Sequence, residues 1–197
     1  MFAPFLPNSP NIYRFSMKDL LRIHYKHLRT SIDPSLNSTI YDNFVKWYQH
    51  FSVVALYYPT KYEADTLRIA SFLKKQGAIL ALPGFNQNGK MVFKLWDGDL
   101  KVSKYKGILE PISDEIVEPD LVIMPLLACD LQGTRLGYGK GCYDQALASL
   151  NAVKLGLCFD LQIADEPLPR EAHDVLLDLI ITEKRVVTLS SFVEVRK

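Results

Sequence analysis

Apolar side chains recur at the spacing of an amphipathic helix in three separate segments of the sequence. The first segment predicts a helix over residues 17–31, opened by Ser16 and Asp19, which have the spacing of a capping box. A second amphipathic helix is predicted within residues 32–51, and a third over residues 62–77, where a glycine closes it. Lysine and arginine side chains follow one flank of the first helix, which is most simply a solvated face.

Short, unbroken apolar runs separate and follow these helices. They predict strands at 52–58, 78–83, 91–96, 120–125, 153–159 and 178–182. Unbroken runs indicate strands that are covered on both faces, as in parallel sheets. Because strands alternate with helices, the pattern predicts an α/β fold, a three-layer α/β/α sandwich with a mainly parallel sheet. The loop-rich stretch 94–120 is expected to form a meander over the active face.

Length and charge narrow the picture further. The 197 residues suit one domain with a substantial core, so we expect a flexible leader over 1–15 and a single catalytic domain over 16–197. Charged residues make up 23% of the chain and the formal net charge is +1. Such a balance gives no global attraction to nucleic acid or to an anionic membrane, so neither is expected as a partner and any cationic site must be local.

The cysteines argue for a reducing compartment. The chain has 3 of them, at positions 129, 142 and 158, and none has the spacing of a CxxC pair or a zinc site. The N-terminus is a poor signal peptide, and the longest apolar run, Leu121 to Cys129, is too short to span a bilayer. A cytoplasmic location is therefore expected.

A glycine-rich loop, "RLGYGKGCYD", lies between a predicted strand and a predicted helix over 143–150. Its glycines allow backbone N–H groups to approach a ligand closely, and Arg135 and Lys140 add positive charge, so the loop favours an anion such as phosphate. A tight turn without a ligand is the alternative. Tyr143 could stack on a ring, and Asp144 could be a helix-dipole partner or a magnesium ligand.

The segment around this loop resembles the signature of the 5-formyltetrahydrofolate cyclo-ligase family. The resemblance rests on "DLVIMPLLACDLQGTRLGYGKGCYDQAL" and, in collinear order, on "KDLLR", "YEADT", "GILEP" and "LPREAHDVLLDLIIT". Three positions depart from the family pattern: Leu126 stands for glycine, Cys129 for phenylalanine and Cys142 for tyrosine. Cys142 is therefore expected either beside the phosphate cradle as a reactive thiol or in the core as a small filler.

The resemblance implies an enzyme that uses ATP and Mg²⁺ to close 5-formyltetrahydrofolate into 5,10-methenyltetrahydrofolate, on a NagB/RpiA/CoA transferase-like fold. The implied partner is the small-molecule substrate, and the implied oligomeric state is a monomer. It also implies the roles of individual residues. The ATP site would comprise Lys18, Arg22, Arg135, Gly137, Tyr138, Gly139, Lys140, Gly141 and Tyr143. Arg135 and Lys140 would be catalytic, Tyr58 and Glu63 would bind substrate, and Asp144 and Asp174 would hold the metal.

Two other classes of function stay open on the sequence. The same architecture hosts sugar-phosphate isomerases and CoA transferases, which would use the loop for a phosphate without needing ATP. A non-catalytic nucleotide-binding or RNA-associated protein could use the basic flank of the first helix, although the near-zero net charge argues against RNA. Dependence on ATP separates the enzyme classes.

Overall fold

The computed structural model describes residues 16–105 and 108–189, so the predicted leader over 1–15 lies outside the described residues. The helices are α1 (Met17–Arg29), α2 (Asn37–Trp47), α3 (Leu67–Lys75) and α4 (Cys142–Leu147), with 3₁₀ turns at Pro34–Leu36 and Asp160–Gln162. The strands of the main sheet are β1 (Val53–Ala55), β2 (Ile79–Phe85), β3 (Met91–Leu95), β6 (Leu121–Met124), β9 (Val153–Leu157), β10 (Leu179–Ile181) and β11 (Val186–Thr188). No helix in the described ranges is long and apolar enough to cross a membrane.

The main sheet has seven strands in the order β11-β10-β9-β6-β1-β2-β3. The inner strands, from β10 to β2, pair in parallel, whereas β11 and β3 pair antiparallel at the two edges. The mainly parallel sheet is thus confirmed, and each predicted strand is present. The sequence did not predict β11, which turns back on β10 and closes one edge.

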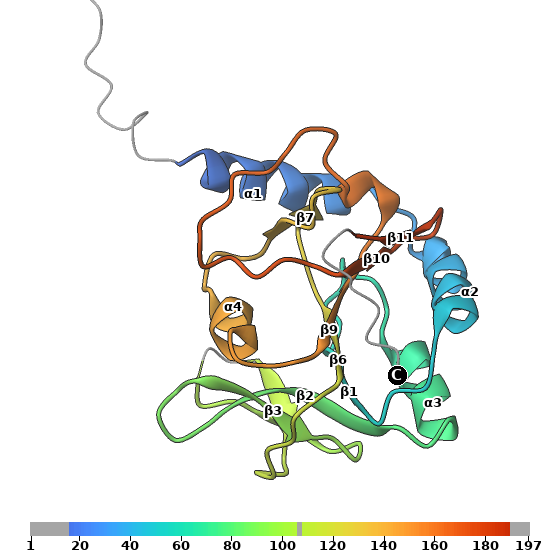
Figure 1. The fold of residues 1–197 in the computed structure, drawn as a ribbon, viewed down its shortest axis with the longest axis vertical. Coiled ribbons are helices and arrows are strands. Elements are labelled where there is room, and N and C mark those ends of the chain that lie inside the picture. Colours follow the sequence, from blue (N-terminus) through green and yellow to red (C-terminus); the bar gives the residue numbers. More distant parts are fainter. Residues whose placement is uncertain (1–15, 106–107, 190–197) are drawn as a thin grey trace, which may run out of the picture.

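Helices cover both faces of the sheet, as Figure 1 shows. On one face, Ile40 and Phe44 of α2 and Ile69 and Leu73 of α3 pack in a single apolar cluster with the strands. On the other face, Leu147 of α4 packs in a second cluster with β6 and β3 residues. Adjacent residues of a strand point to opposite faces, so a strand that is covered on both faces is apolar at successive positions. The three-layer prediction is confirmed, with a thin layer on the α4 side.

Two of the predicted helices are shorter than expected. The third begins at Leu67 rather than at residue 62, because Glu63 accepts hydrogen bonds from the backbone N and Oγ1 of Thr60 and fixes this stretch as a loop. The fourth has only 6 residues, Cys142–Leu147. The first helix has the predicted capping box, in which the Ser16 side chain accepts from the Asp19 N–H and the Asp19 carboxylate accepts from Ser16.

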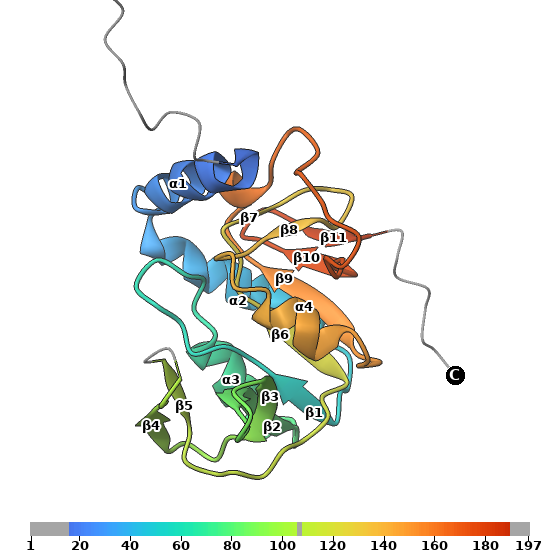
Figure 2. The ribbon, with the colours of Figure 1, turned by 90° about the vertical axis from the view of Figure 1, so that its left-hand side faces the viewer.

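Two small antiparallel ribbons stand at opposite sides of the sheet's end (Figure 2). The ribbon of β7 (Ala128–Cys129) and β8 (Arg135–Leu136) carries α1, whose Tyr25 is buried in a cluster with Leu127, Ala128, Leu136 and Leu168. The ribbon of β4 (Leu100–Val102) and β5 (Leu109–Pro111) lies in the predicted meander. Its buried Glu110 accepts from the backbone N–H of Phe85, which fixes this ribbon to β2. The two ribbons therefore face each other across the loops that follow the strands.

Candidate active site

A cleft of about 1130 Å³ opens between these two ribbons. It lies at the carboxyl ends of β1 and β6, which is where open α/β sheets bind ligands. Every site residue predicted from the sequence lines it: Lys18, Arg22, Tyr58, Glu63, Arg135, Gly137, Tyr138, Gly139, Lys140, Gly141, Tyr143, Asp144 and Asp174. The fold brings these residues together from α1, the loop after β1, the glycine loop and the loop before β10. Their individual roles stay predictions.

The glycine loop is held in its shape by α1. Arg22 donates from Nε to the carbonyl oxygen of Gly137 at 3.1 Å, and its guanidinium also contacts Asp19 at 2.8 Å. Gly139 has a φ of 87°, and a Cβ there would lie 3.1 Å from Cζ of Arg22. A side chain at this position would therefore strain the backbone and push against the arginine that braces the loop.

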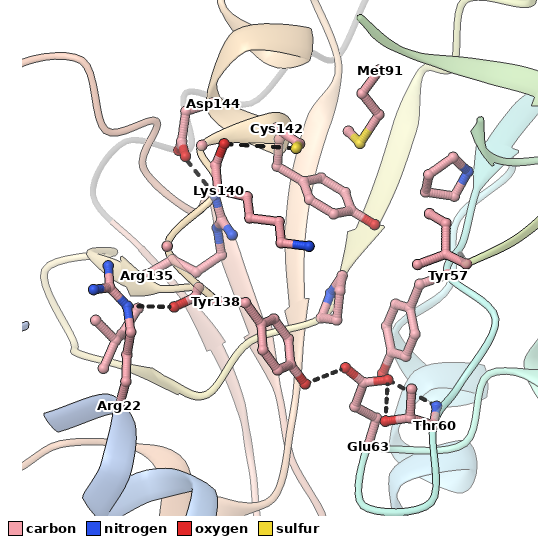
Figure 3. Close-up of a pocket in the computed structure, with 18 of the residues that line it drawn as sticks. Arg22, Tyr57, Thr60, Glu63, Met91, Arg135, Tyr138, Lys140, Cys142 and Asp144 are labelled. Atoms are coloured by element: carbon pink, nitrogen blue, oxygen red, sulfur yellow. Dashed lines mark hydrogen bonds and ion pairs between the residues drawn. The ribbon is translucent and has the colours of Figure 1, made fainter. Parts of the chain in front are cut away.

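The helix that follows the loop contributes less than the sequence suggested. Gly141, with a φ of 60°, caps α4 without a side-chain hydrogen bond, and the helix has 6 residues. Because so short a helix aligns few peptide dipoles, the positive potential at the loop comes mainly from side chains. Lys140 is exposed and extends into the cleft (Figure 3). It is thus a charge that an anion can reach.

Arg135 is the fixed cation of the site. Its side chain is only 6% exposed, and Nη2 donates to Oδ1 of Asp144 at 2.9 Å. Asp144 also accepts from the backbone N–H of Val175 at 3.2 Å, so the carboxylate is held from two sides. The guanidinium carbon of Arg135 lies 5.5 Å from the ring centre of Tyr143, and its Nε has no hydrogen-bond partner among the described residues. The arginine is positioned in advance, with donor capacity to spare.

Tyr143 supports this arginine rather than standing free. Its ring lies 6.5 Å from that of Phe93, on the side of the sheet covered by α4. Burial raises the pKa of Tyr143, in spite of the opposing charge of Arg135, so the phenol keeps its proton. The predicted stacking role would need the face of the ring that these neighbours leave open.

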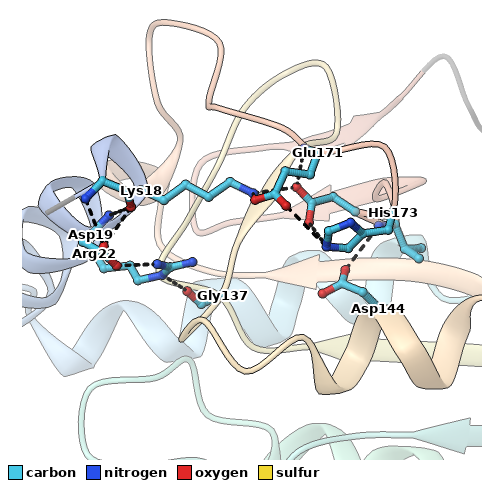
Figure 4. Close-up of polar contacts among 10 residues, drawn as sticks. Lys18, Asp19, Arg22, Gly137, Asp144, Glu171 and His173 are labelled. Carbon is cyan, nitrogen blue, oxygen red and sulfur yellow. Dashed lines mark hydrogen bonds and ion pairs between the residues drawn. The ribbon is translucent and has the colours of Figure 1, made fainter. Parts of the chain in front are cut away.

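A second charged group connects α1 to the loop before β10. Lys18 Nζ lies 2.8 Å from both Oε1 of Glu171 and Oδ2 of Asp174 (Figure 4). Partial burial lowers the pKa of Lys18, but hydrogen bonds to the two carboxylates outweigh it and raise the pKa overall. Burial raises the pKa of Asp174, yet the bond from Lys18 leaves it lowered. All three groups are therefore charged at neutral pH. His173, to which the sequence assigned no role, is 71% exposed at the edge of this group.

The carboxylates predicted to hold a metal are both paired with cations. Asp144 faces Arg135, and Asp174 faces Lys18. In the part of the chain that the structure describes, no three His, Cys, Asp or Glu side chains are grouped as a metal site requires. Mg²⁺ in nucleotide enzymes commonly takes one or two carboxylates and completes its shell with phosphate oxygens and water. The donor set fits that kind of site, and not a preformed metal cage.

Glu63 presents a carboxylate on the opposite side of the cleft. Thr60 donates to its Oε2 from N and from Oγ1, both at 2.8 Å, and Tyr138 donates its hydroxyl to Oε1 at 2.6 Å (Figure 3). Burial of the hydroxyl and the adjacent Glu63 carboxylate raise the pKa of Tyr138, so this hydroxyl keeps the proton it donates. The bond bridges the cleft from the glycine loop to the loop after β1. Tyr58 lies at the rim and is 38% exposed, whereas Tyr57 is buried beneath it.

The three thiols differ in accessibility. Cys142 lines the cleft, is half-buried and lies with its Sγ 3.7 Å from the carbonyl oxygen of Lys140. Cys129 and Cys158 are fully buried, with their sulfur atoms 4.0 Å apart. Of the two placements considered for Cys142, the structure has the one beside the loop and not the one in the core.

The sequence missed several residues of the cleft. The most telling is Arg29, two turns of α1 beyond Arg22, whose side chain is 6% exposed and which lines the cleft. Its position on the same flank as Lys18 and Arg22 was the available signal, but an i+7 spacing alone looks like a solvated face. The apolar wall formed by Pro83, Phe85 and Met91 was also missed, because its residues appear in sequence only as parts of strands.

Comparison with known proteins bears on what this cleft is for. A sequence profile of the 5-formyltetrahydrofolate cyclo-ligase family matches residues 35–183. The chain belongs to this family. The 5-formyltetrahydrofolate cyclo-ligase of Mycolicibacterium smegmatis is 30% identical over 67% of this chain and 74% of its own, and that of Escherichia coli K12 is 30% identical over 68% and 79%.

Solved structures agree with the family assignment. The 5,10-methenyltetrahydrofolate synthetase of Aquifex aeolicus is 30% identical, with a TM-score of 0.78 over 92% of this chain and 97% of its own. That of Mycoplasma pneumoniae, at 24% identity, shares the fold with a TM-score of 0.69 over 85% and 99%. The profile match begins after Lys18 and Arg22, so their place in the cleft rests on the geometry of α1. The NagB/RpiA label for the fold stays a prediction.

Proposed function

We propose that the protein is a 5-formyltetrahydrofolate cyclo-ligase that converts 5-formyltetrahydrofolate into 5,10-methenyltetrahydrofolate at the expense of ATP. One observation carries the proposal: a single cleft in a member of this family has a cationic glycine loop on one side and the held carboxylate of Glu63 on the other. The first suits a polyphosphate, and the second suits the N–H groups of a pterin. A sugar-phosphate enzyme would need only the first.

The chemistry follows from the substrate. The oxygen of the formyl amide is a poor leaving group until it accepts the γ-phosphoryl group of ATP, with ADP departing. N10 then attacks the formyl carbon and loses its proton, and the carbon–oxygen bond breaks as inorganic phosphate leaves, which gives the methenyl bridge. Neither step requires a covalent nucleophile from the protein. Both require in-line placement and neutralisation of negative charge on the transferring group.

The residues of the cleft divide this work. Lys140 and Arg135 neutralise charge on the phosphates, with Lys140 exposed in the cleft and Arg135 fixed by Asp144. Lys18 and Arg22 add charge from α1, and Gly137, Tyr138, Gly139 and Gly141 give the nucleotide a close-fitting backbone. Tyr143 lies beneath the loop. Glu63, with Tyr58 at the rim, orients the pterin so that N10 can reach the formyl carbon.

We further propose that Asp144 and Asp174 hold Mg²⁺ together with the phosphates. Mg²⁺ supplies charge neutralisation and a fixed geometry for the phosphate oxygens when it is bound. Arg135 and Lys18 then exchange part of their contact with these carboxylates for contact with phosphate oxygens. The carboxylates would in this way keep their charge balanced both with and without the nucleotide.

A direct assay tests the function. With 5-formyltetrahydrofolate, ATP and Mg²⁺, the absorbance of the methenyl product should rise, and it should stay flat when either ATP or the divalent ion is left out. Turnover without ATP, or no turnover from a sample shown to be folded, would reject the proposal. A full rate with ATP in the presence of a chelator would reject only the metal.

The remaining expectations concern the whole protein. We propose a cytoplasmic location, because an odd number of cysteines without CxxC spacing suits a reducing compartment, and a monomer whose residues 16–197 form one catalytic domain. The described strands from β1 to β11 include seven that form one continuous sheet, which supports a single domain. Light scattering coupled to gel filtration tests the oligomeric state, with a mass of 22.4 kDa expected.

A further inference from the structure

Arg29 is a buried charge with two donor nitrogens that lack a hydrogen-bond partner among the described residues. Its side chain is 6% exposed, and Nε and Nη1 have no hydrogen-bond partner among the described residues. Nη1 lies 3.9 Å from Oε1 of Glu63, which is an ion pair but too long for a hydrogen bond. Its guanidinium carbon lies 5.5 Å from the ring centre of Tyr138, within the range of a cation–π contact.

Such an arrangement is costly unless a ligand completes it. Enclosed donors that have lost water and gained no acceptor destabilise the fold, and charged donors do so more than neutral ones. Glu63 offsets the charge of Arg29 but does not accept its N–H groups. The missing partner is therefore an acceptor atom that arrives with a ligand in the cleft, next to the Glu63 carboxylate.

Glu63 is arranged to share that ligand. Its Oε2 is occupied by the two donors of Thr60, which fix the carboxylate, whereas Oε1 receives only the Tyr138 hydroxyl. Oε1 is also the oxygen that faces Nη1 of Arg29. The cleft thus presents a donor and an acceptor side by side. A ring in which a carbonyl is bonded to an N–H group offers the complementary pair.

We propose that Arg29 is a specificity-determining residue that donates to the ring carbonyl of the substrate while Glu63 accepts from the adjacent ring N–H. The inference rests on the proposed function, since the pyrimidinone ring of a tetrahydrofolate has this pair of groups. The Tyr138 hydroxyl occupies Oε1 until the substrate replaces it. The pair then distinguishes a 4-oxo ring from a 4-amino ring, in which the carbonyl becomes an amine and the ring N–H becomes an acceptor.

A ligand with the two groups exchanged tests this directly. Isothermal titration of the full chain with 5-formyltetrahydrofolate and with its 4-amino analogue should show that the wild type prefers the oxo ligand by about tenfold to a hundredfold, since the wrong ring leaves two buried groups unpaired. In Arg29→Met, affinity for the oxo ligand should fall by at least about tenfold and the oxo/amino ratio should drop to within about threefold of unity.

Lys26→Met is the matched control. Lys26 lines the same cleft on the same helix, but it is exposed, so its loss removes a charge without removing a buried donor. Its oxo/amino ratio should equal that of the wild type. Arg29→Lys, which keeps the charge but lacks the planar fork, should lie between the wild type and Arg29→Met.

Each outcome has a meaning. A wild type with no oxo/amino preference overturns the inference even if every Arg29 variant fails to fold. A folded Arg29→Met that keeps the wild-type ratio also overturns it. So does an Arg29→Met that binds ATP more weakly but folate as before, because adenine offers an amine beside a ring nitrogen to the same pair. Failure of the proposed function looks different, since the wild type would then bind neither folate and form no methenyl product.

Discussion

At the scale of single residues, the cleft contains cations that are held by carboxylates and cations that are exposed. Arg135 and Lys18 are each held within 3 Å of carboxylates, whereas Lys140 is exposed on the loop. Arg135 and Lys140 were visible in the sequence as cations inside the glycine loop, whereas Lys18 was singled out only by the family resemblance of "KDLLR". The sequence could not identify Arg29, because the property that matters there is burial, which depends on the distant Glu63 and Tyr138.

Lys140→Ala should lower kcat by ~10²-fold or more if Lys140 stabilises charge on the transferring group, as such donors do. The melting temperature should stay within error of the wild type, because an exposed loop side chain contributes little to stability. Lys75→Ala, at an equally exposed lysine of α3, controls for loss of charge. Normal turnover in Lys140→Ala would mean that the loop is only a turn.

Cys142 should be alkylated faster than the other two thiols, and Mg-ATP should protect it. It is half-buried in the cleft beside Arg135 and Lys140, whereas Cys129 and Cys158 are fully buried. Mass spectrometry after brief iodoacetamide treatment, with and without the nucleotide, measures the order. Equal labelling of the three cysteines, or labelling of Cys142 that ignores the nucleotide, would separate this thiol from the nucleotide site.

At the scale of elements, α1 acts as a brace between two loops that come from distant parts of the chain. Arg22 holds the glycine loop, and Lys18 holds the loop before β10. The sequence predicted α1 and its capping box because both depend on neighbours three or four residues away. It misplaced the start of α3 by five residues, because Glu63 forms part of a loop closed by Thr60, and helical periodicity carries no information about that bond.

The ion pairs between Lys18 of α1 and the loop before β10 should make the stability of the protein depend on pH. Glu171 and Asp174 have lowered pKa values beside Lys18, so their contribution to stability is present above 4.5 and 3.8, their ordinary values, and is lost as the pH falls below these. Lys18→Met should therefore be less stable than the wild type near neutral pH, and loss of the partly buried Lys18–Asp174 pair should account for no more than about 1 kcal/mol. The difference should vanish well below pH 3.8.

Urea unfolding at the two pH values measures this difference. Lys26→Met, at an exposed lysine of the same helix, should show no such pH dependence. If the Lys18→Met difference persisted unchanged in acid, the contact with Asp174 would not be what stabilises the loop before β10.

At the scale of the whole molecule, the sheet brings together two proposed half-sites, the glycine loop for the phosphates and Glu63 for the pterin. The two share no sequence motif. The strands of the main sheet except β11, the three layers and the family were predictable, because apolar runs and the glycine-loop motif are local patterns. The two ribbons were not, since β7, β8, β4 and β5 have only two or three residues each and form through pairing with each other. Their positions determine the width of the cleft.

Two variants should separate the half-sites. Asp144→Asn should raise the Mg²⁺ concentration needed for half-maximal rate, because it weakens a carboxylate beside the phosphates and loosens Arg135. Glu63→Gln should weaken folate binding and leave the affinity for ATP unchanged, because the glutamine oxygen can still accept the hydrogen bond from the Tyr138 hydroxyl. Titration of each ligand in each variant measures both effects. Equal losses for both ligands in both variants would show that the division of the cleft is wrong.

The hydroxyl of Tyr138 spans these half-sites, with its backbone in the glycine loop and its proton on Glu63. In the proposed complex, a folate that takes Glu63 must displace the hydroxyl of Tyr138, a residue of the loop that would receive the phosphates. Nucleotide and folate are then thermodynamically linked, so the factor by which folate changes the affinity for nucleotide equals the factor by which nucleotide changes the affinity for folate. One phenol shared between the glycine loop and Glu63 is enough to make the two substrates sense each other before any bond is made or broken.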